Sequence, residues 1–146
     1  MTNYSETSAF SIQILPNNIF HVTIKEGAVV DMNAAAQLVE ATNNMLDCSI
    51  PFRAGIYDIS KVKSVTDDAR NYLSTTSDIK GTVVGTALIS STFIGRMVGN
   101  LFITLSGTSK FPIQFFDSPM GAEHWIQTRL EDEQNVNPQE TEKGVA

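Results

Sequence analysis

Polar side chains that suit catalysis or binding are concentrated in two short segments of this 146-residue chain. Each segment follows a run of apolar residues that predicts a buried strand. Open α/β sheets bind their ligands at the carboxyl ends of their strands. Asp58 is the most informative member, because a carboxylate that ends a buried strand is costly unless it accepts hydrogen bonds. The N–H groups that open the following helix are its expected donors. The candidate binding residues are Asp58, Ser60, Ser64, Thr66, Asp67, Ser91 and Thr92.

No motif for catalysis or cofactor binding accompanies these residues. The two histidines, His21 and His124, do not stand at metal-ligand spacing from a cysteine or a carboxylate. The sequence has no glycine-rich phosphate loop after a strand and no nucleophile elbow. Hydroxyls and acids are also the usual residues of helix caps and turns. The sequence therefore predicts no catalytic residue, no metal site and no cofactor.

The net charge of −6 is concentrated at the C-terminal end, where residues 131–146 contain five acidic residues and one lysine. The rest of the chain is nearly neutral and lacks the basic face that nucleic-acid binding requires. The single cysteine, Cys48, excludes an intramolecular disulfide and is typical of a reducing compartment. No apolar run approaches the ~20 residues of a membrane span, and the first residues lack a signal-peptide pattern. The prediction is a cytoplasmic protein with no nucleic-acid partner and no membrane span.

Strands and helices alternate along the chain. Apolar alternation on both sides of Pro16-Asn17-Asn18 predicts a β-hairpin, and later strands have the continuous apolar character of buried parallel strands. Asp31 and Thr66 are the expected N-caps of the first two helices. Because strand–helix–strand passages require right-handed crossovers, the sheet is predicted to be mixed and mostly parallel. The predicted order is ββαβαβαβα, with strands at 10–14, 20–24, 54–59, 83–89 and 113–116 and helices at 32–47, 66–80, 91–106 and 118–130.

The predicted helix at 91–106 has the clearest apolar periodicity. Phe93 and Ile103 fall outside its inner stripe, and Gly99 leaves a flat patch near Ile103. These three residues are the candidate contact of a homodimer or of a partner helix. Gly95 and Gly99 match a membrane dimerisation motif in spacing, but the helix is amphipathic and we do not assign that role. The predicted inner stripe comprises Ile94, Met97, Val98, Leu101, Phe102 and Leu105.

The segment Tyr57-Asp58-Ile59-Ser60-Lys61-Val62, followed by Val65-Thr66-Asp67-Asp68-Ala69, resembles the STAS domain, the fold shared by anti-sigma-factor antagonists and sulfate-transporter tails. The last third, with Ala87-Leu88-Ile89-Ser90 and Pro112-Ile113-Gln114-Phe115-Phe116, looks like an uncharacterised bacterial branch grouped with STAS-like and CRAL-TRIO-like domains. The resemblance implies one STAS-like α/β domain with four helices at 9–130. A flexible N-terminus at 1–8 and a disordered acidic tail at 131–146 are expected to flank it.

The resemblance also implies a function. STAS antagonists carry an Asp-Ser pair at the start of their second helix, and phosphorylation of that serine breaks partner binding. By position, Thr66 falls on the family's aspartate and Asp67 on its serine, so Thr66 or Ser64 would have to replace the serine. The interpretation is a non-enzymatic regulatory interaction module without the usual serine phosphoswitch, its protein partner left open. The alternatives are a domain that binds a small apolar ligand or lipid, and an enzyme that uses Asp58 as acid or base.

Overall fold

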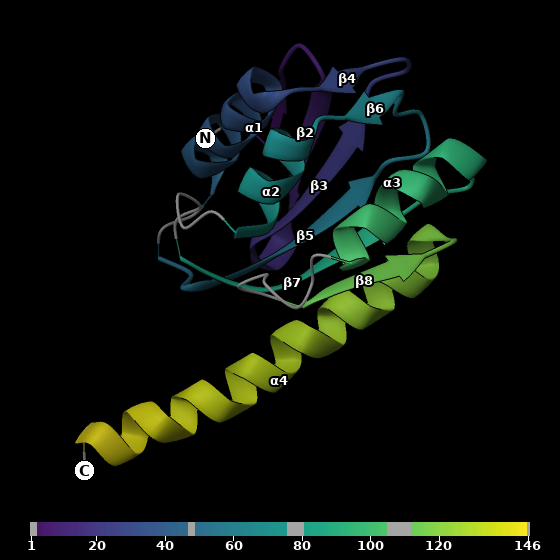
Figure 1. Ribbon diagram of the computed structural model, residues 1–146. Helices are drawn as coiled ribbons and strands as arrows, with labels where there is room; N and C mark the ends of the chain where they lie inside the picture. Colours follow the sequence, from purple (N-terminus) through teal and green to yellow (C-terminus); the bar gives the residue numbers. More distant parts are fainter. Residues whose placement is uncertain (1–2, 47–48, 76–80, 105–111, 146) are drawn as a thin grey trace.

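The chain alternates strands and helices in the predicted order (Figure 1). The computed structural model describes residues 3–46, 49–75, 81–104 and 112–145, so Cys48 lies outside the described residues. Three short strands, β1 (Tyr4–Glu6), β4 (Val29–Val30) and β6 (Ser64–Val65), add to the prediction. The predicted elements are β2 (Phe10–Leu15), β3 (Ile19–Ile24), α1 (Met32–Met45), β5 (Phe52–Asp58), α2 (Asp67–Thr75), β7 (Thr82–Ile89), α3 (Phe93–Thr104), β8 (Ile113–Phe116) and α4 (Pro119–Val145).

Six strands form the main sheet in the order β1-β2-β3-β5-β7-β8. β2 pairs antiparallel with β1 and β3, whereas the pairs β3–β5, β5–β7 and β7–β8 are parallel. In the β5–β7 pair, Tyr57 lies beside Leu88 and Asp58 beside Ile89. The two short strands β4 and β6 pair in parallel with each other. The prediction of a mixed, mostly parallel sheet with an N-terminal hairpin is confirmed.

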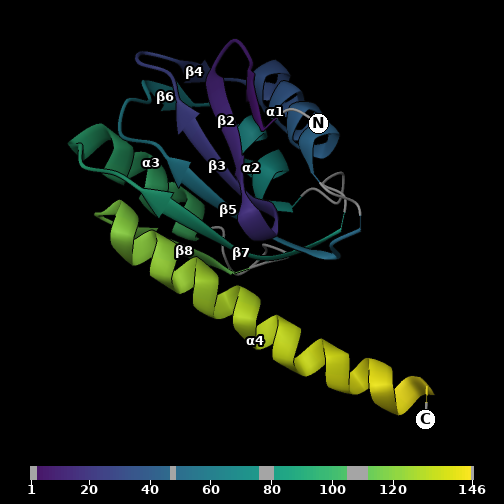
Figure 2. The ribbon, with the colours of Figure 1, turned by 180° about the vertical axis from the view of Figure 1, so that it is seen from behind.

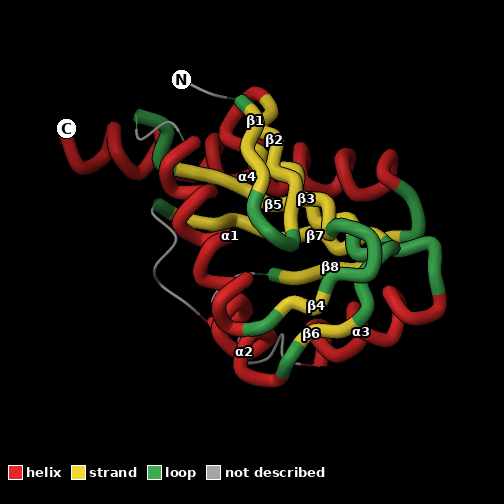
Figure 3. The backbone as a smooth tube through the Cα atoms, turned by 90° about the horizontal axis from the view of Figure 1, so that it is seen from above, coloured by secondary structure: helices red, strands yellow, loops and turns green. Residues whose placement is uncertain are grey.

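Helices cover the two faces of the sheet unequally. Figure 3 shows α4 on one face of the sheet and α2 and α3 on the other. Figure 2 shows the same arrangement from the side opposite to that of Figure 1. The larger core packs α1, α2 and α3 against the sheet. The smaller core lies under α4, where Ala122, Ile126 and Leu130 are almost fully buried. Trp125 packs at a tilt against Phe116, with ring centroids 5.7 Å apart.

Side-chain caps fix where the helices begin. Asp31 accepts a hydrogen bond from Ala34 N at 2.8 Å and caps α1. Thr66 Oγ1 accepts one from Ala69 N at 3.4 Å ahead of α2. Thr92 Oγ1 accepts one from Gly95 N at 3.1 Å ahead of α3. Because each cap satisfies a backbone N–H that the helix leaves unpaired, these start points follow from the local sequence.

The first residues of the chain take part in the sheet, where the sequence predicted a flexible segment at 1–8. The carbonyl of Asn3 accepts a hydrogen bond from Ile14 N at 2.9 Å as β1 joins β2. Ser8 Oγ also donates to Gln37 Oε1 on α1 at 3.0 Å. These contacts are made by main-chain and polar groups, so apolar alternation gives no signal for them.

Helix α4 continues to Val145, past the predicted helix end at Leu130 and into the predicted disordered tail. Figure 1 shows its C-terminal half extending away from the sheet. Among the side chains described on α4, Leu130 is the last buried one. The difference arises because apolar periodicity reports burial, so it gives no signal for a helix beyond Leu130.

Helix α3 exposes part of the stripe that the sequence placed inward. Ile94 is 52% exposed and Met97 is 54% exposed, whereas Val98 is buried as predicted. The side chains of residues 101–105, which complete the predicted stripe, lie outside the described side chains. The inner face of α3 is therefore rotated from the one that periodicity predicts.

Two glycines account for this rotation. A Cβ on Gly95 would lie 2.8 Å from the carbonyl oxygen of Ile59, and a Cβ on Gly99 would lie 2.6 Å from the ring of Phe115. Both distances are shorter than atoms tolerate, so only glycine lets α3 sit this close to the sheet. Gly99 consequently faces β8 and is not part of the outer face on which the sequence placed it.

Candidate functional site

The predicted binding residues lie in two separate groups, one at the carboxyl ends of β5 and β7 and the other at the start of α2. Ser60, Ser91 and Thr92 form the first group, between the end of β5 and the start of α3. Ser60 Oγ accepts a hydrogen bond from Ser91 N at 3.1 Å, and the carbonyl of Ser60 accepts one from Thr92 Oγ1 at 2.7 Å. The fully buried Ser90 Oγ accepts from Thr92 N at 3.1 Å. We call Ser60, Ser90, Ser91 and Thr92 the hydroxyl cluster.

Asp58 joins this cluster through a turn. Its Oδ1 accepts a hydrogen bond from Ser60 N at 3.0 Å, two residues along the chain. The sequence instead predicted donors at the start of α2, which is wrong because the chain turns back on itself directly after β5. A carboxylate that accepts the N–H two residues on is typical of an Asx turn. Asp58 therefore has a local structural partner that satisfies its half-buried carboxylate.

The second group surrounds the start of α2. Thr66 caps the helix and donates to Asp68 Oδ1. This hydrogen bond, followed by that from Ala69 N, holds the pKa of the exposed Asp68 carboxyl below its ordinary value. Asp67 forms an ion pair with Arg70 at 2.8 Å and is otherwise exposed. Ser64 lies in β6, whose pairing with β4 places this group beside the loop after β3.

The structure thus unites Asp58, Ser60, Ser91 and Thr92 and leaves Ser64, Thr66 and Asp67 in a separate group. The hydrogen bonds of the first group stay within the turns after β5 and β7, and they support the start of α3. A general acid or base needs a partner that shares or moves a proton. Within the described ranges neither histidine bonds to this cluster, and no three His, Cys, Asp or Glu side chains converge as a metal site requires.

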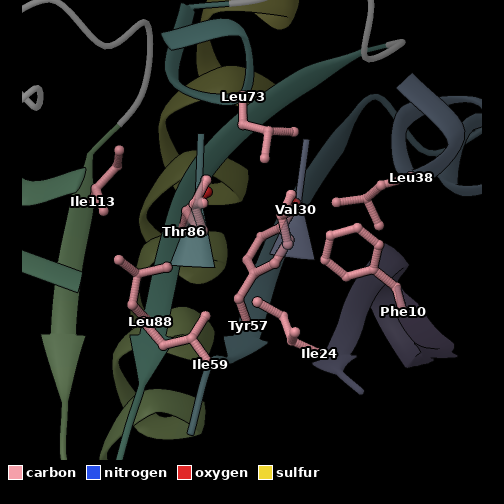
Figure 4. Close-up of a pocket in the computed structure, with 11 residues that line it drawn as sticks. Phe10, Ile24, Val30, Leu38, Tyr57, Ile59, Leu73, Thr86, Leu88 and Ile113 are labelled. Carbon is pink, nitrogen blue, oxygen red and sulfur yellow. The ribbon is translucent and has the colours of Figure 1, made fainter. Parts of the chain in front are cut away.

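Three hollows lie near these elements. A small apolar cavity of about 40 Å³ lies in the core between the sheet and α1 and α2 (Figure 4). A groove of about 650 Å³ runs between β1 and α1, and another of about 390 Å³ lies between β3 and the start of α4. Asp58 lines none of the three.

Three of the four large apolar side chains that are exposed on the helices, among the side chains described, lie on the outer face of α3. We define it by Phe93, Ile94 and Met97, which are 77%, 52% and 54% exposed. Figure 1 shows that α3 begins beside the carboxyl ends of the strands, and Thr92 of the hydroxyl cluster caps its first turn. Phe93 lies outward as the sequence predicted. The side chain of Ile103 lies outside the described side chains. Ile94 and Met97 were not predicted to be exposed, because their spacing matches the inner stripe.

Two residues in the core cavity also escaped the sequence analysis. Tyr57 and Thr86 project into it from the neighbouring strands β5 and β7. Each is a hydroxyl-bearing residue inside a nearly continuous apolar strand, which is the signal that would have identified them.

Of the helices described, none combines the length and the apolar character that crossing a membrane requires.

Comparison with known proteins supports the fold. The model of a family described as a domain of unknown function, DUF7793, matches residues 12–130. No curated protein matches the sequence. The crystal structure of an uncharacterised protein from Shewanella loihica PV-4, of the DUF3478 family and with a SpoIIAA-like fold, matches with a TM-score of 0.51. The two sequences are 14% identical, and the match covers 84% of this chain and 99% of the other. The STAS-like fold is confirmed.

Proposed function

The chain belongs to the DUF7793 family, and from its STAS-like fold and its surface we propose that it is a non-enzymatic protein-interaction module. The observation that carries this proposal is the outer face of α3. Three large apolar side chains in consecutive turns of one helix form a contact that a partner would desolvate. The partner is another protein, and a second copy of this chain is one candidate. A single cysteine and a nearly neutral body support a cytoplasmic location and no nucleic-acid partner.

Enzymatic use of Asp58 receives less support. The carboxylate is held by the N–H of Ser60 and lines none of the three hollows. The hydroxyls next to it are engaged in capping and turn formation. The hydrogen bonds of these hydroxyls instead hold the start of α3 in place. They thereby position Phe93 and Ile94 for contact with a partner.

Affinity capture from the native cell tests the interaction. The native chain and the double variant Phe93→Lys with Met97→Lys serve as baits, and bound proteins are quantified by mass spectrometry. We expect a partner that the native bait retains and the double variant loses at least tenfold, because lysine introduces unpaired charges into an apolar contact. Met120→Lys on α4 is the matched control, since Met120 is 81% exposed but lies on the other face of the sheet. Equal capture by all three baits would reject the α3 surface.

We also propose that the usual serine phosphoswitch is absent. Asp67 already places a carboxylate at the family's serine position, and the Thr66 hydroxyl bonds to Asp68. A phosphate on Thr66 would add about −1.5 to −2 charges beside these two acids and be repelled by them. Phosphoproteomics of the native protein should therefore find no dominant site between residues 64 and 69. A stoichiometric phosphate on Thr66 or Ser64 would contradict this expectation.

A further inference from the structure

Two hydroxyl groups stand out in the otherwise apolar lining of the small core cavity. Nine apolar side chains and the hydroxyls of Tyr57 and Thr86 line it (Figure 4). Thr86 is only 7% exposed. Neither hydroxyl has a hydrogen-bond partner among the residues that the structure describes. An occupant that accepts a hydrogen bond from each hydroxyl would satisfy the two polar groups in an otherwise apolar lining.

The register of the sheet fixes both hydroxyls in place. Thr86 lies beside Gly55 in the β5–β7 pair, and Tyr57 follows two residues later on the same face. A Cβ on Gly55 would lie 2.5 Å from the ring of Phe20 and 2.8 Å from that of Tyr57. Gly55 therefore makes room for the edge-to-face pair of Phe20 and Tyr57, whose ring centroids are 5.9 Å apart. This packing restrains the phenol at the cavity.

The chemistry of the lining defines what the cavity accepts. None of the eleven lining residues carries a charge. An anion or cation inside would lose its hydration without gaining a counter-charge, which is costly. Burial raises the pKa of Tyr57 far above its ordinary value, so the phenol keeps its proton and can donate a hydrogen bond. The occupant must therefore be neutral and must present an acceptor.

The volume sets the size of the occupant. About 40 Å³ exceeds the ~10–15 Å³ that one water needs and falls far below the ~300–1,000 Å³ of sites for drug-sized ligands. We propose that the cavity is a binding site for a neutral molecule of a few heavy atoms with one oxygen acceptor, such as a small ketone, aldehyde or alcohol. Tyr57 and Thr86 hydrogen-bond to that oxygen, and the apolar walls enclose its carbon atoms. This site is independent of the interaction surface on α3.

Acetone and acetate test the proposal, because they are nearly equal in shape and differ in charge. Titrations of each into the native protein are followed by the methyl NMR signals of Leu73, Leu88 and Ile113, which line the cavity. We expect acetone to shift these signals in a saturable manner and acetate to leave them unchanged. Removal of one hydrogen bond of about 1 kcal/mol should weaken acetone binding about fivefold in Tyr57→Phe and in Thr86→Val.

Thr82→Val is the matched control, since Thr82 lies on β7 but is exposed, and it should bind acetone like the native protein. Equal shifts with acetone and acetate would overturn the proposal. Signals that do not move with acetone would also overturn it and assign the cavity to water alone. If an isosteric variant fails to fold, the comparison of acetone with acetate on the native protein still decides the outcome.

Discussion

Replacing Gly95 by alanine should lower the free energy of unfolding by about 3 kcal/mol, at the upper end of the cost of overpacking a core. The new methyl group would meet the side-chain oxygen of Ser90 and would lie 2.8 Å from the carbonyl oxygen of Ile59. The carbonyl belongs to the backbone, and Ser90 is fully buried and bonded to Thr92. Neither neighbour can move cheaply. Alanine is the better helix former by about 1 kcal/mol, which offsets only part of this cost.

Urea unfolding followed by circular dichroism measures the effect. Gly121→Ala is the matched control on α4, where the nearest atom to an added Cβ belongs to the Phe116 ring at 3.3 Å. A side chain can adjust by that amount, so this variant should be neutral or slightly stabilised. Equal stability of Gly95→Ala and the native protein would show that α3 does not depend on this close approach.

The fold was largely predictable because its strongest signals are local. The strand that ends at Asp58 and the strand that ends at Ile89 are short, apolar and followed by cap residues, as parallel strands require. Asp31 and Thr66 marked helix starts that the structure places as expected. Prediction failed for elements whose formation depends on pairing with residues distant in the sequence. β1 depends on pairing with β2, and no apolar pattern within Tyr4–Glu6 records that pairing.

The site was less predictable than the fold for a related reason. Sequence proximity to the ends of β5 and β7 identified the hydroxyl-rich rim, but only the turn after Asp58 shows that Ser60 bonds across to Thr92. Glycine carries no weight in an apolar pattern, so the inward face of α3 at Gly95 was assigned to Ile94. Tyr57 was included in a strand pattern as an apolar residue, which concealed its hydroxyl.

Self-association is the simplest form that the proposed interaction can take, and the α3 outer face predicts how it should respond to substitution. The sequence predicted a contact that includes Phe93 and Ile103. The side chain of Ile103 is not described, whereas Met97 is exposed one turn from Phe93 and takes its place in the proposed contact. Phe93→Lys with Met97→Lys should raise the dimer dissociation constant about 100-fold, because two central apolar contacts are each worth about 1–2 kcal/mol or more.

Sedimentation equilibrium over a range of concentrations measures this change, and thermal melting checks that the variant is folded. Both side chains are more than half exposed in the single chain, so lysine at these positions should leave the melting temperature unchanged. Met120→Lys should leave the association unchanged, because α4 lies on the opposite face of the sheet. If the native chain sediments as a monomer at high micromolar concentration, the second copy is excluded as partner. The α3 surface must then bind a different protein, which the capture experiment would reveal by its loss from the same double variant.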